Sequence, residues 1–220
     1  MLRETVKTAA KRSVSSTRWL QRQLNDPYVI EARRQGLRSR AAFKLMQLDD
    51  RFHVLGPGKR VVDLGAAPGG WSQVAAERVR AGTPQGGRVV GIDILEWDPV
   101  PNTTTIVHDF LDAAAPRLIT EALDGPADVV LSDMAAPTTG HASTDHLRIV
   151  AMVEVALDFA FTILAPGGSF VAKVFQGGTE RELLDQMKRR FATVRHAKPA
   201  ASRAESAETY VVAQGFRDAP

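Results

Sequence analysis

Seven short runs of β-branched and apolar residues alternate with longer helical patterns, and this alternation restricts the possible folds more than any other feature. The runs cover residues 60–64, 88–93, 103–108, 128–133, 169–175, 192–197 and 209–216. Most are almost continuously apolar, as expected for strands that helices cover on both faces. We therefore expect an α/β fold with a doubly wound, mostly parallel seven-stranded sheet, helices on both of its faces, and one antiparallel strand near the C-terminus.

Two helical patterns are especially clear between these runs. Residues 145–164 carry apolar side chains at helical spacing and end at "APGG". Residues 40–52 predict an amphipathic helix whose apolar side holds Ala41, Leu45, Leu48 and Phe52, and whose other side holds Arg40, Lys44, Gln47 and Arg51. A basic side cannot face the core. Because the helix directly precedes the first strand, we expect that side to lie near the carboxyl edge of the sheet.

Charge is distributed unevenly along the chain. Residues 1–44 contain eleven Lys or Arg and three acids, a net of +8, whereas the remaining residues contain 17 basic and 22 acidic side chains, a net of −5. Concentrated positive charge favours a polyanionic partner such as nucleic acid, although a merely solvated tail has the same composition. We expect a basic arm over residues 1–18 and one folded domain over residues 19–220. The cluster Arg33, Arg34, Arg38 and Arg40 is expected to contact RNA phosphates.

The absence of cysteine excludes disulfides, thiolate catalysis and cysteine-based metal sites. No apolar run reaches the roughly 18–20 residues that span a bilayer, and the N-terminus lacks the apolar segment of a signal peptide. These observations predict a cytoplasmic protein without a membrane partner. The length of a single domain and the lack of an obvious apolar patch favour a monomer.

The segment "VVDLGAAPGGW", residues 61–71, runs from the first predicted strand into a glycine-rich bend. In open α/β sheets this first strand-to-helix turn is the usual ligand site, because glycines allow a ligand to approach the backbone closely. The order Gly-Ala-Ala-Pro-Gly-Gly is neither the dinucleotide fingerprint G-x-G-x-x-G nor a phosphate loop with its Lys-Ser/Thr ending. A ligand without a pyrophosphate is therefore favoured.

Acids at the ends of the next two strands support an adenosine ligand. Asp93 ends the second strand, where it can bind ribose hydroxyls, and Asp109 follows the third, where it can accept from an adenine amino group. Each acid alone is more often a turn or cap residue. Adenosine without a pyrophosphate indicates S-adenosylmethionine as the cofactor, and Trp71 is expected to form an apolar wall beside its methionine part.

Five longer segments together carry a family resemblance: "GLRSRAAFKL", "VVDLGAAPGGWSQV", "SDMA", "LAPGGSFVAKVFQG" and "SRAESAETYVVAQGF". They closely resemble the bacterial FtsJ-type ribosomal RNA large-subunit methyltransferases, from about Trp19 to Phe216. The resemblance implies a Rossmann-like class I methyltransferase fold. It also implies methyl transfer from S-adenosylmethionine to the ribose 2′-hydroxyl of a uridine in 23S rRNA, within the large ribosomal subunit or its precursor.

The same resemblance implies the site residues. The catalytic set is Lys44, Asp133, Lys173 and Glu208, and the cofactor contacts are Gly69, Trp71, Asp93, Asp109 and Asp133. Two features depart from the family: "AAPTTG" lacks the usual Asn near Pro137, and the N-terminus before Trp19 is extended. The first concerns local substrate contacts and the second leaves the role of the arm open.

This chemistry explains why two lysines would be needed. A ribose hydroxyl is a poor nucleophile until it loses its proton, and a lysine can take that proton only in its neutral form, which a neighbouring cation favours. Lys44 and Lys173 can act on each other in this way, with Asp133 and Glu208 orienting the amines. We expect Lys173 to be the general base. No metal site is expected, because His141 and His146 lack a third ligand.

Two alternatives come from other functional classes. A nicotinamide-dependent oxidoreductase would need the G-x-G-x-x-G fingerprint, which is absent, and would not need a lysine in the fifth strand. A non-catalytic RNA-binding or ribosome-assembly protein would not need all four catalytic positions to be filled. Related methyltransferases act on tRNA or mRNA caps, but the short chain without insertions and the ribosomal-type motifs favour rRNA.

Overall fold

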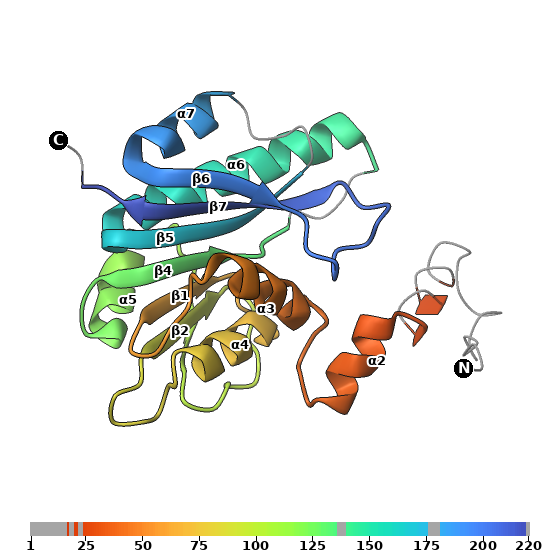
Figure 1. Cartoon of the computed structure of the whole chain (residues 1–220), viewed down its shortest axis with the longest axis horizontal. Helices are drawn as coiled ribbons and strands as arrows, with labels where there is room; N and C mark the ends of the chain where they lie inside the picture. The colour runs from red at the N-terminus through yellow and green to blue at the C-terminus, as the bar shows by residue number, and fades with distance from the viewer. Residues whose placement is uncertain (1–16, 18–19, 22–23, 136–139, 176–180, 219–220) are drawn as a thin grey trace.

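The computed structural model describes residues 17, 20–21, 24–135, 140–175 and 181–218. Seven strands form one sheet in the order β3-β2-β1-β4-β5-β7-β6 (Figure 1). They are β1 (Arg60–Leu64), β2 (Arg88–Asp93), β3 (Thr104–Val107), β4 (Ala127–Ser132), β5 (Leu164–Phe175), β6 (Phe191–Ala197) and β7 (Glu208–Phe216). Only β7 runs antiparallel to its neighbours β5 and β6, and the other pairs are parallel. The predicted fold class is confirmed.

Helices cover both faces of this sheet. The helices in the described ranges are α2 (Pro27–Arg34), α3 (Ala41–Phe52), α4 (Gly70–Arg78), α5 (Ala115–Leu123), α6 (Ala142–Ile163) and α7 (Arg181–Arg190). One apolar core joins α5, α6 and α7 to the sheet, and a second joins α3 and α4 to the opposite face. Figure 1 shows α2 beside α3 and away from the sheet. None of the helices in the described ranges is both long and apolar enough to cross a membrane.

The order of the strands reverses at the centre of the sheet. From β1 the chain proceeds outward to β2 and β3 on one side, and then returns to β4 on the other side of β1. The carboxyl ends of β1 and β4 therefore diverge into connections on opposite faces, which leaves a crevice between them. This topology, rather than any one motif, determines where a ligand can bind.

Element boundaries follow the sequence predictions closely, with one notable difference. The predicted helix over residues 40–52 is α3, and the pattern over 145–164 is α6. However, β5 begins at Leu164, five residues before the predicted start, because Leu164 already pairs with Ala127 of β4. The ladder then shifts register before Val129 pairs with Ser169. The "APGG" segment is thus an irregular part of the strand, which local turn preferences alone do not predict.

The predicted basic arm over residues 1–18 lies, apart from residue 17, outside the described residues. The family departure near Pro137 also lies outside them. These two predictions therefore stay predictions.

Candidate active site and cofactor cavity

The four predicted catalytic residues come from four separate elements. Lys44 lies on α3, Asp133 directly follows β4, Lys173 lies near the end of β5, and Glu208 begins β7. The sheet register explains their proximity. Ser132 is the register partner of Ala172 in the β4–β5 ladder. The residues that follow them, Asp133 after β4 and Lys173 in β5, therefore also lie side by side. All four converge at the carboxyl end of the central parallel strands.

Their side chains form a charge-balanced cluster. The Lys44 Nζ lies 2.7 Å from the Glu208 Oε2 and 3.8 Å from the Asp133 Oδ2. The Lys173 Nζ lies 3.1 Å from the Asp133 Oδ1 and donates a 2.7 Å hydrogen bond to the Asp133 backbone carbonyl. Both lysines are buried, with 9% of Lys44 and 8% of Lys173 exposed. Because a buried charge without a partner is costly, each lysine depends on these carboxylates for its place in the site.

Glu208 is held as a carboxylate by its surroundings. Burial acts to raise its pKa, but the charge and hydrogen bond of Lys44, together with the Ser202 hydroxyl and the charge of Lys173, outweigh that effect and lower the pKa overall. The Ser202 Oγ donates to the Glu208 Oε1 at 2.7 Å, while Lys44 occupies the other oxygen. Glu208 is therefore an orienting acceptor for Lys44 rather than a proton donor.

Tyr210 joins this cluster, although the sequence patterns did not single it out. It is fully buried, and its Oη donates a 2.6 Å hydrogen bond to the Asp133 Oδ1. Burial and the negative charges of Asp133 and Glu208 raise the pKa of the Tyr210 hydroxyl well above its usual value, so the hydroxyl stays protonated and donates. A signal was present in the sequence: residues two apart in a strand share a face, which puts Tyr210 on the side of Glu208.

A cavity of about 560 Å³ lies next to this cluster, at the carboxyl ends of β1, β2, β3 and β4. Three predicted acids, Asp93, Asp109 and Asp133, line it. Its apolar lining includes Ile92, Leu95, Phe110, Leu111, Met134 and Met152. Apolar walls with a few acceptors at separate points, at this volume, are typical of a small-molecule site. Both features fit an adenosine-containing ligand such as S-adenosylmethionine.

The acids in the cavity are held by local backbone contacts. The two carboxylate oxygens of Asp93 accept from the backbone N–H groups of Ala67 and Leu95, at 3.0 and 2.9 Å. The Asp109 Oδ1 accepts from the Leu111 N–H at 2.9 Å. Asp93 thus joins the glycine bend after β1 to the turn after β2. Its direction is fixed before any ligand arrives, which reduces the entropy cost of binding.

Gly69 and Trp71 were also predicted to contact the cofactor, but their surroundings differ from those of the three acids. Neither is among the described residues that line the cavity. Trp71 is buried, its indole N–H donates to the Ala41 backbone carbonyl at 2.8 Å, and its ring centroid lies 5.7 Å from that of Tyr210. In this structure the indole therefore joins α4 to α3 and β7, and its predicted contact with the cofactor stays a prediction. Gly69 has φ +100° and is the residue before α4.

The predicted phosphate-binding cluster divides into two kinds of residue. Arg33 and Arg34 are exposed at the end of α2, where Arg34 pairs with Glu31 at 2.5 Å. By contrast, the Arg40 Nη1 lies 2.6 Å from the buried Asp26 carboxylate, and the guanidinium of Arg38 donates to backbone carbonyls. Internal partners thus engage Arg34, Arg38 and Arg40 in this structure, and the expectation that the cluster binds phosphate stays a prediction.

The comparisons with known proteins agree with this arrangement. The profile of the FtsJ-like methyltransferase family matches residues 37–216. A ribosomal RNA large subunit methyltransferase E of Paramagnetospirillum magneticum is 72% identical over 213 residues, which cover 96% of this chain and 87% of that protein. The enzyme of the same name from Rhodospirillum rubrum is 65% identical over 212 residues, which cover 96% of this chain and 81% of that protein.

A solved structure supports the same assignment. A Plasmodium falciparum protein assigned as a ribosomal RNA methyltransferase has 30% sequence identity and a TM-score of 0.71. The match covers 81% of this chain and 98% of that one. These similarities contradict the oxidoreductase alternative and make this chain an enzyme with S-adenosylmethionine as its methyl donor. From its residues, its sheet and its relatives, the chain belongs to the FtsJ-like methyltransferase family.

Proposed function

We propose that this enzyme methylates the ribose 2′-hydroxyl of a uridine in 23S rRNA. The observation that carries the proposal is the position of Asp133, which lines the cofactor cavity and also pairs with Lys173. A proton acceptor and a methyl donor can therefore meet at one point of the site. The names of the relatives from two bacteria support ribosomal RNA of the large subunit as the substrate.

S-adenosylmethionine, when bound, supplies an electrophilic methyl group on a positively charged sulfur. Held in the cavity that Asp93, Asp109 and Asp133 line, it would give this methyl group to the ribose oxygen, and the carbon–sulfur bond would break with its electron pair left on sulfur. In our proposal the hydroxyl proton passes to the Nζ of Lys173, which must be neutral when it accepts. Because the methyl group is already reactive, alignment and proton transfer are the enzyme's main contributions.

The other polar residues have supporting roles in this proposal. Asp133 orients Lys173 through its Oδ1 and its backbone carbonyl, and Tyr210 in turn fixes that carboxylate. Lys44, held by Glu208 at 2.7 Å, contributes the second positive charge near Lys173. Asp93 and Asp109 are proposed to bind the ribose and the adenine of the cofactor. The contacts of Gly69 and Trp71 with the cofactor belong to the same proposal.

The natural substrate is proposed to be rRNA within the large ribosomal subunit or its precursor, and the enzyme is proposed to act as a monomer. Since bacterial ribosomes are assembled in the cytoplasm, we place its activity there. A non-catalytic role in ribosome assembly is the competing function, and methyl transfer discriminates the two.

The decisive experiment follows a tritiated methyl group from the cofactor into RNA. Purified enzyme should label large subunits from cells that lack the gene, and mass spectrometry should locate a single 2′-O-methyluridine in 23S rRNA. Subunits from cells that have the gene should accept almost no label, because their site is already modified. Label on a base, on tRNA, or on no RNA at all would contradict the proposal.

A further inference from the structure

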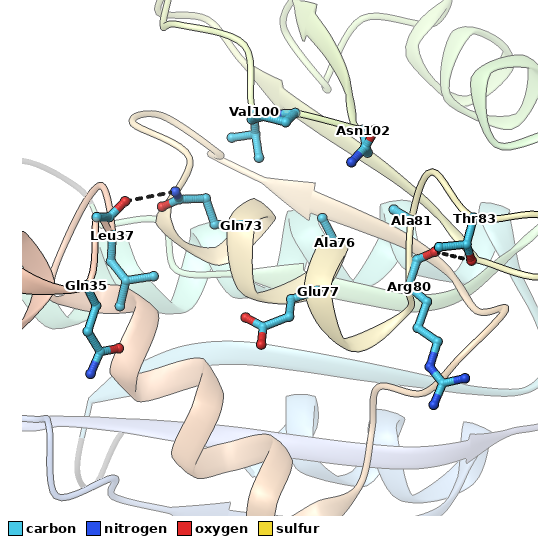
Figure 2. Close-up of a pocket in the computed structure, with 12 residues that line it drawn as sticks. Gln35, Leu37, Gln73, Ala76, Glu77, Arg80, Ala81, Thr83, Val100 and Asn102 are labelled. Atoms are coloured by element: carbon cyan, nitrogen blue, oxygen red, sulfur yellow. Dashed lines mark hydrogen bonds between the residues drawn. The ribbon is translucent and has the colours of Figure 1, made fainter.

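Residues 35–40 connect α2 to α3, and they contact the first turn of α4 at Gly70 and Gln73. Gln73 of α4 attaches this connection twice: its Oε1 accepts from the Arg38 backbone N–H at 2.8 Å, and its Nε2 donates to the Gly36 carbonyl at 3.2 Å. Figure 2 shows Gln73 extending from α4 toward the segment that contains Leu37. The backbone of Arg38 is therefore fixed close to the start of α4, the helix that follows the glycine bend.

The side chain of Arg38 continues from this anchor to two other loops. Its Nη1 donates to the Pro68 carbonyl at 3.2 Å and to the Asp98 carbonyl, and its Nη2 donates to the Pro99 carbonyl at 2.6 Å. No carboxylate in the described part of the chain forms an ion pair with Arg38. A planar guanidinium presents its donors in a fixed arrangement, so it can hold several carbonyls at once.

The two loops that Arg38 joins are those that also carry the cofactor contacts. Pro68 belongs to the glycine bend after β1, and Asp98 and Pro99 belong to the loop that directly follows Asp93, the last residue of β2. Asp93 joins the same two loops through the Ala67 N–H, from which it accepts at 3.0 Å. The bend and the loop are therefore connected at two points, by a carboxylate that lines the cavity and by a guanidinium that does not.

Gly69 allows this close approach. A Cβ atom at Gly69 would lie 3.2 Å from both the Cδ and the Nη1 of Arg38, and 2.7 Å from the Val100 Cγ2. At such distances the side chains of Val100 and Arg38 would have to shift to admit a Cβ atom, and a left-handed φ would add strain. The backbone of the bend thus packs directly against the Arg38 side chain and the Val100 side chain of the second loop.

We propose that Arg38 is a positioning residue for the cofactor, and not a phosphate-binding residue. It fixes the glycine bend against the loop after β2, and so holds the backbone around Ala67 and the carboxylate of Asp93 in their binding positions. The inference rests on the cofactor cavity of the proposed function, but not on the identity of the RNA. Binding of S-adenosylmethionine without RNA therefore tests it independently of methyl transfer.

Two substitutions test this role by calorimetry with S-adenosylmethionine. Arg38→Ala removes all three donations, and we expect the dissociation constant to rise about tenfold, as for the loss of one net charge-assisted hydrogen bond. Arg38→Lys keeps the charge but cannot hold three carbonyls, so we expect a smaller rise of about threefold to fivefold. Arg33→Ala, which removes an exposed arginine at the end of α2, is the matched control and should leave the constant unchanged.

Steady-state kinetics and RNA binding distinguish a positioning role from a loosened fold and from a phosphate contact. The KM for S-adenosylmethionine should rise in both Arg38 variants while kcat and the affinity for RNA stay close to wild type.

Three outcomes would overturn the proposal. General loosening of the fold would lower the melting temperature and weaken the binding of both the cofactor and RNA. Unchanged cofactor affinity in Arg38→Lys and Arg38→Ala also overturns it. So does lower RNA affinity with a reduced salt dependence, which would identify a phosphate contact. If Arg38→Ala does not fold, Arg38→Lys decides.

Discussion

The proposed catalytic cluster and the proposed cofactor cavity share Asp133 but are constructed differently. In the cluster, Lys44, Lys173 and Glu208 come from distant parts of the chain, and ion pairs between side chains hold the cluster together. In the cavity, Asp93 and Asp109 accept hydrogen bonds from backbone N–H groups, those of Leu95 and Leu111 in their own turns and that of Ala67 in the bend after β1. Charge is balanced inside the cluster, whereas in the cavity the acceptors line a space that a ligand must fill.

Because of this difference, the two regions should respond differently to substitution. A residue of the cluster is held by the neighbours that it also holds, so its removal disturbs the others and the effects are not additive. A residue of the cavity is held by backbone that persists after its removal, so its loss should stay local and concern the ligand. The chemical step should depend on the cluster, and cofactor affinity should depend on the cavity.

The largest effect is expected at Lys173. Lys173→Met removes the proposed proton acceptor but keeps a side chain of similar length, and kcat should fall by about 10²–10⁴. Cofactor affinity should change little, because the cavity is lined by other residues. Single-turnover methyl transfer and calorimetry measure the two quantities. A variant that retains near wild-type turnover would show that the proton acceptor lies elsewhere.

Asp63 interacts electrostatically with Asp133 and Asp93 and gives the next largest effect. It is buried in β1, accepts a 2.7 Å hydrogen bond from the Ser72 hydroxyl, and was not singled out by the sequence patterns. Burial and the negative charges of Asp133 and Asp93, opposed by the hydrogen bond of Ser72, together raise the pKa of Asp63 to about 7. A carboxyl with this pKa binds its proton more tightly in the folded than in the unfolded chain.

This linkage makes stability depend on pH with a definite sign. The contribution of Asp63 is fully present below about pH 4 and is lost as the pH rises to about 7. In urea unfolding, the wild type should therefore lose about 2–4 kcal/mol relative to Asp63→Asn across that window, with no further change above it. A difference that stays constant with pH would show that Asp63 titrates as an ordinary carboxyl.

Substitutions at Asp93 should change cofactor affinity and spare kcat, which is the opposite of the result expected for Lys173→Met. Asp93→Ala should weaken cofactor binding by about 1–3 kcal/mol, since it removes a charged acceptor and frees the N–H groups of Ala67 and Leu95. Asp93→Asn keeps one oxygen, so its cofactor affinity should lie between those of the wild type and Asp93→Ala. At saturating cofactor, kcat should approach the wild-type value. If kcat falls while calorimetry finds the affinity unaltered, the distinction between the regions is wrong.

The smallest effect is expected outside both regions, at the exposed end of α2. Substituting Arg33 and Arg34 together by Ala should weaken binding to RNAs of many sequences about equally. Each lost phosphate contact should reduce the slope of log affinity against log salt by about 0.7–0.9. Cofactor affinity and kcat should not change. An unaltered salt slope would mean that these arginines are only solvated and that RNA follows another path.

Local patterns in the sequence were sufficient for the sheet and for much of the candidate site. Continuous β-branched runs specify buried strands, because only a sheet covered on both faces can remove them from water. The glycine bend and the acids Asp93 and Asp109 were found for the same kind of reason, since turn residues and strand ends have short-range signatures. The predicted catalytic positions Lys44 and Glu208 came from the family motifs and not from spacing, because they lie 164 positions apart in the chain.

Tertiary structure alone decided which partners the charged residues take. Composition treats Arg33, Arg34, Arg38 and Arg40 as one basic cluster, but folding leaves the first two at the surface and directs Arg38 onto backbone carbonyls. The carbonyl of Pro99 is 61 residues away from Arg38, and no local pattern encodes such a pairing. The cost of burying a charge is set by its neighbours in space, and those neighbours exist only after the sheet has assembled.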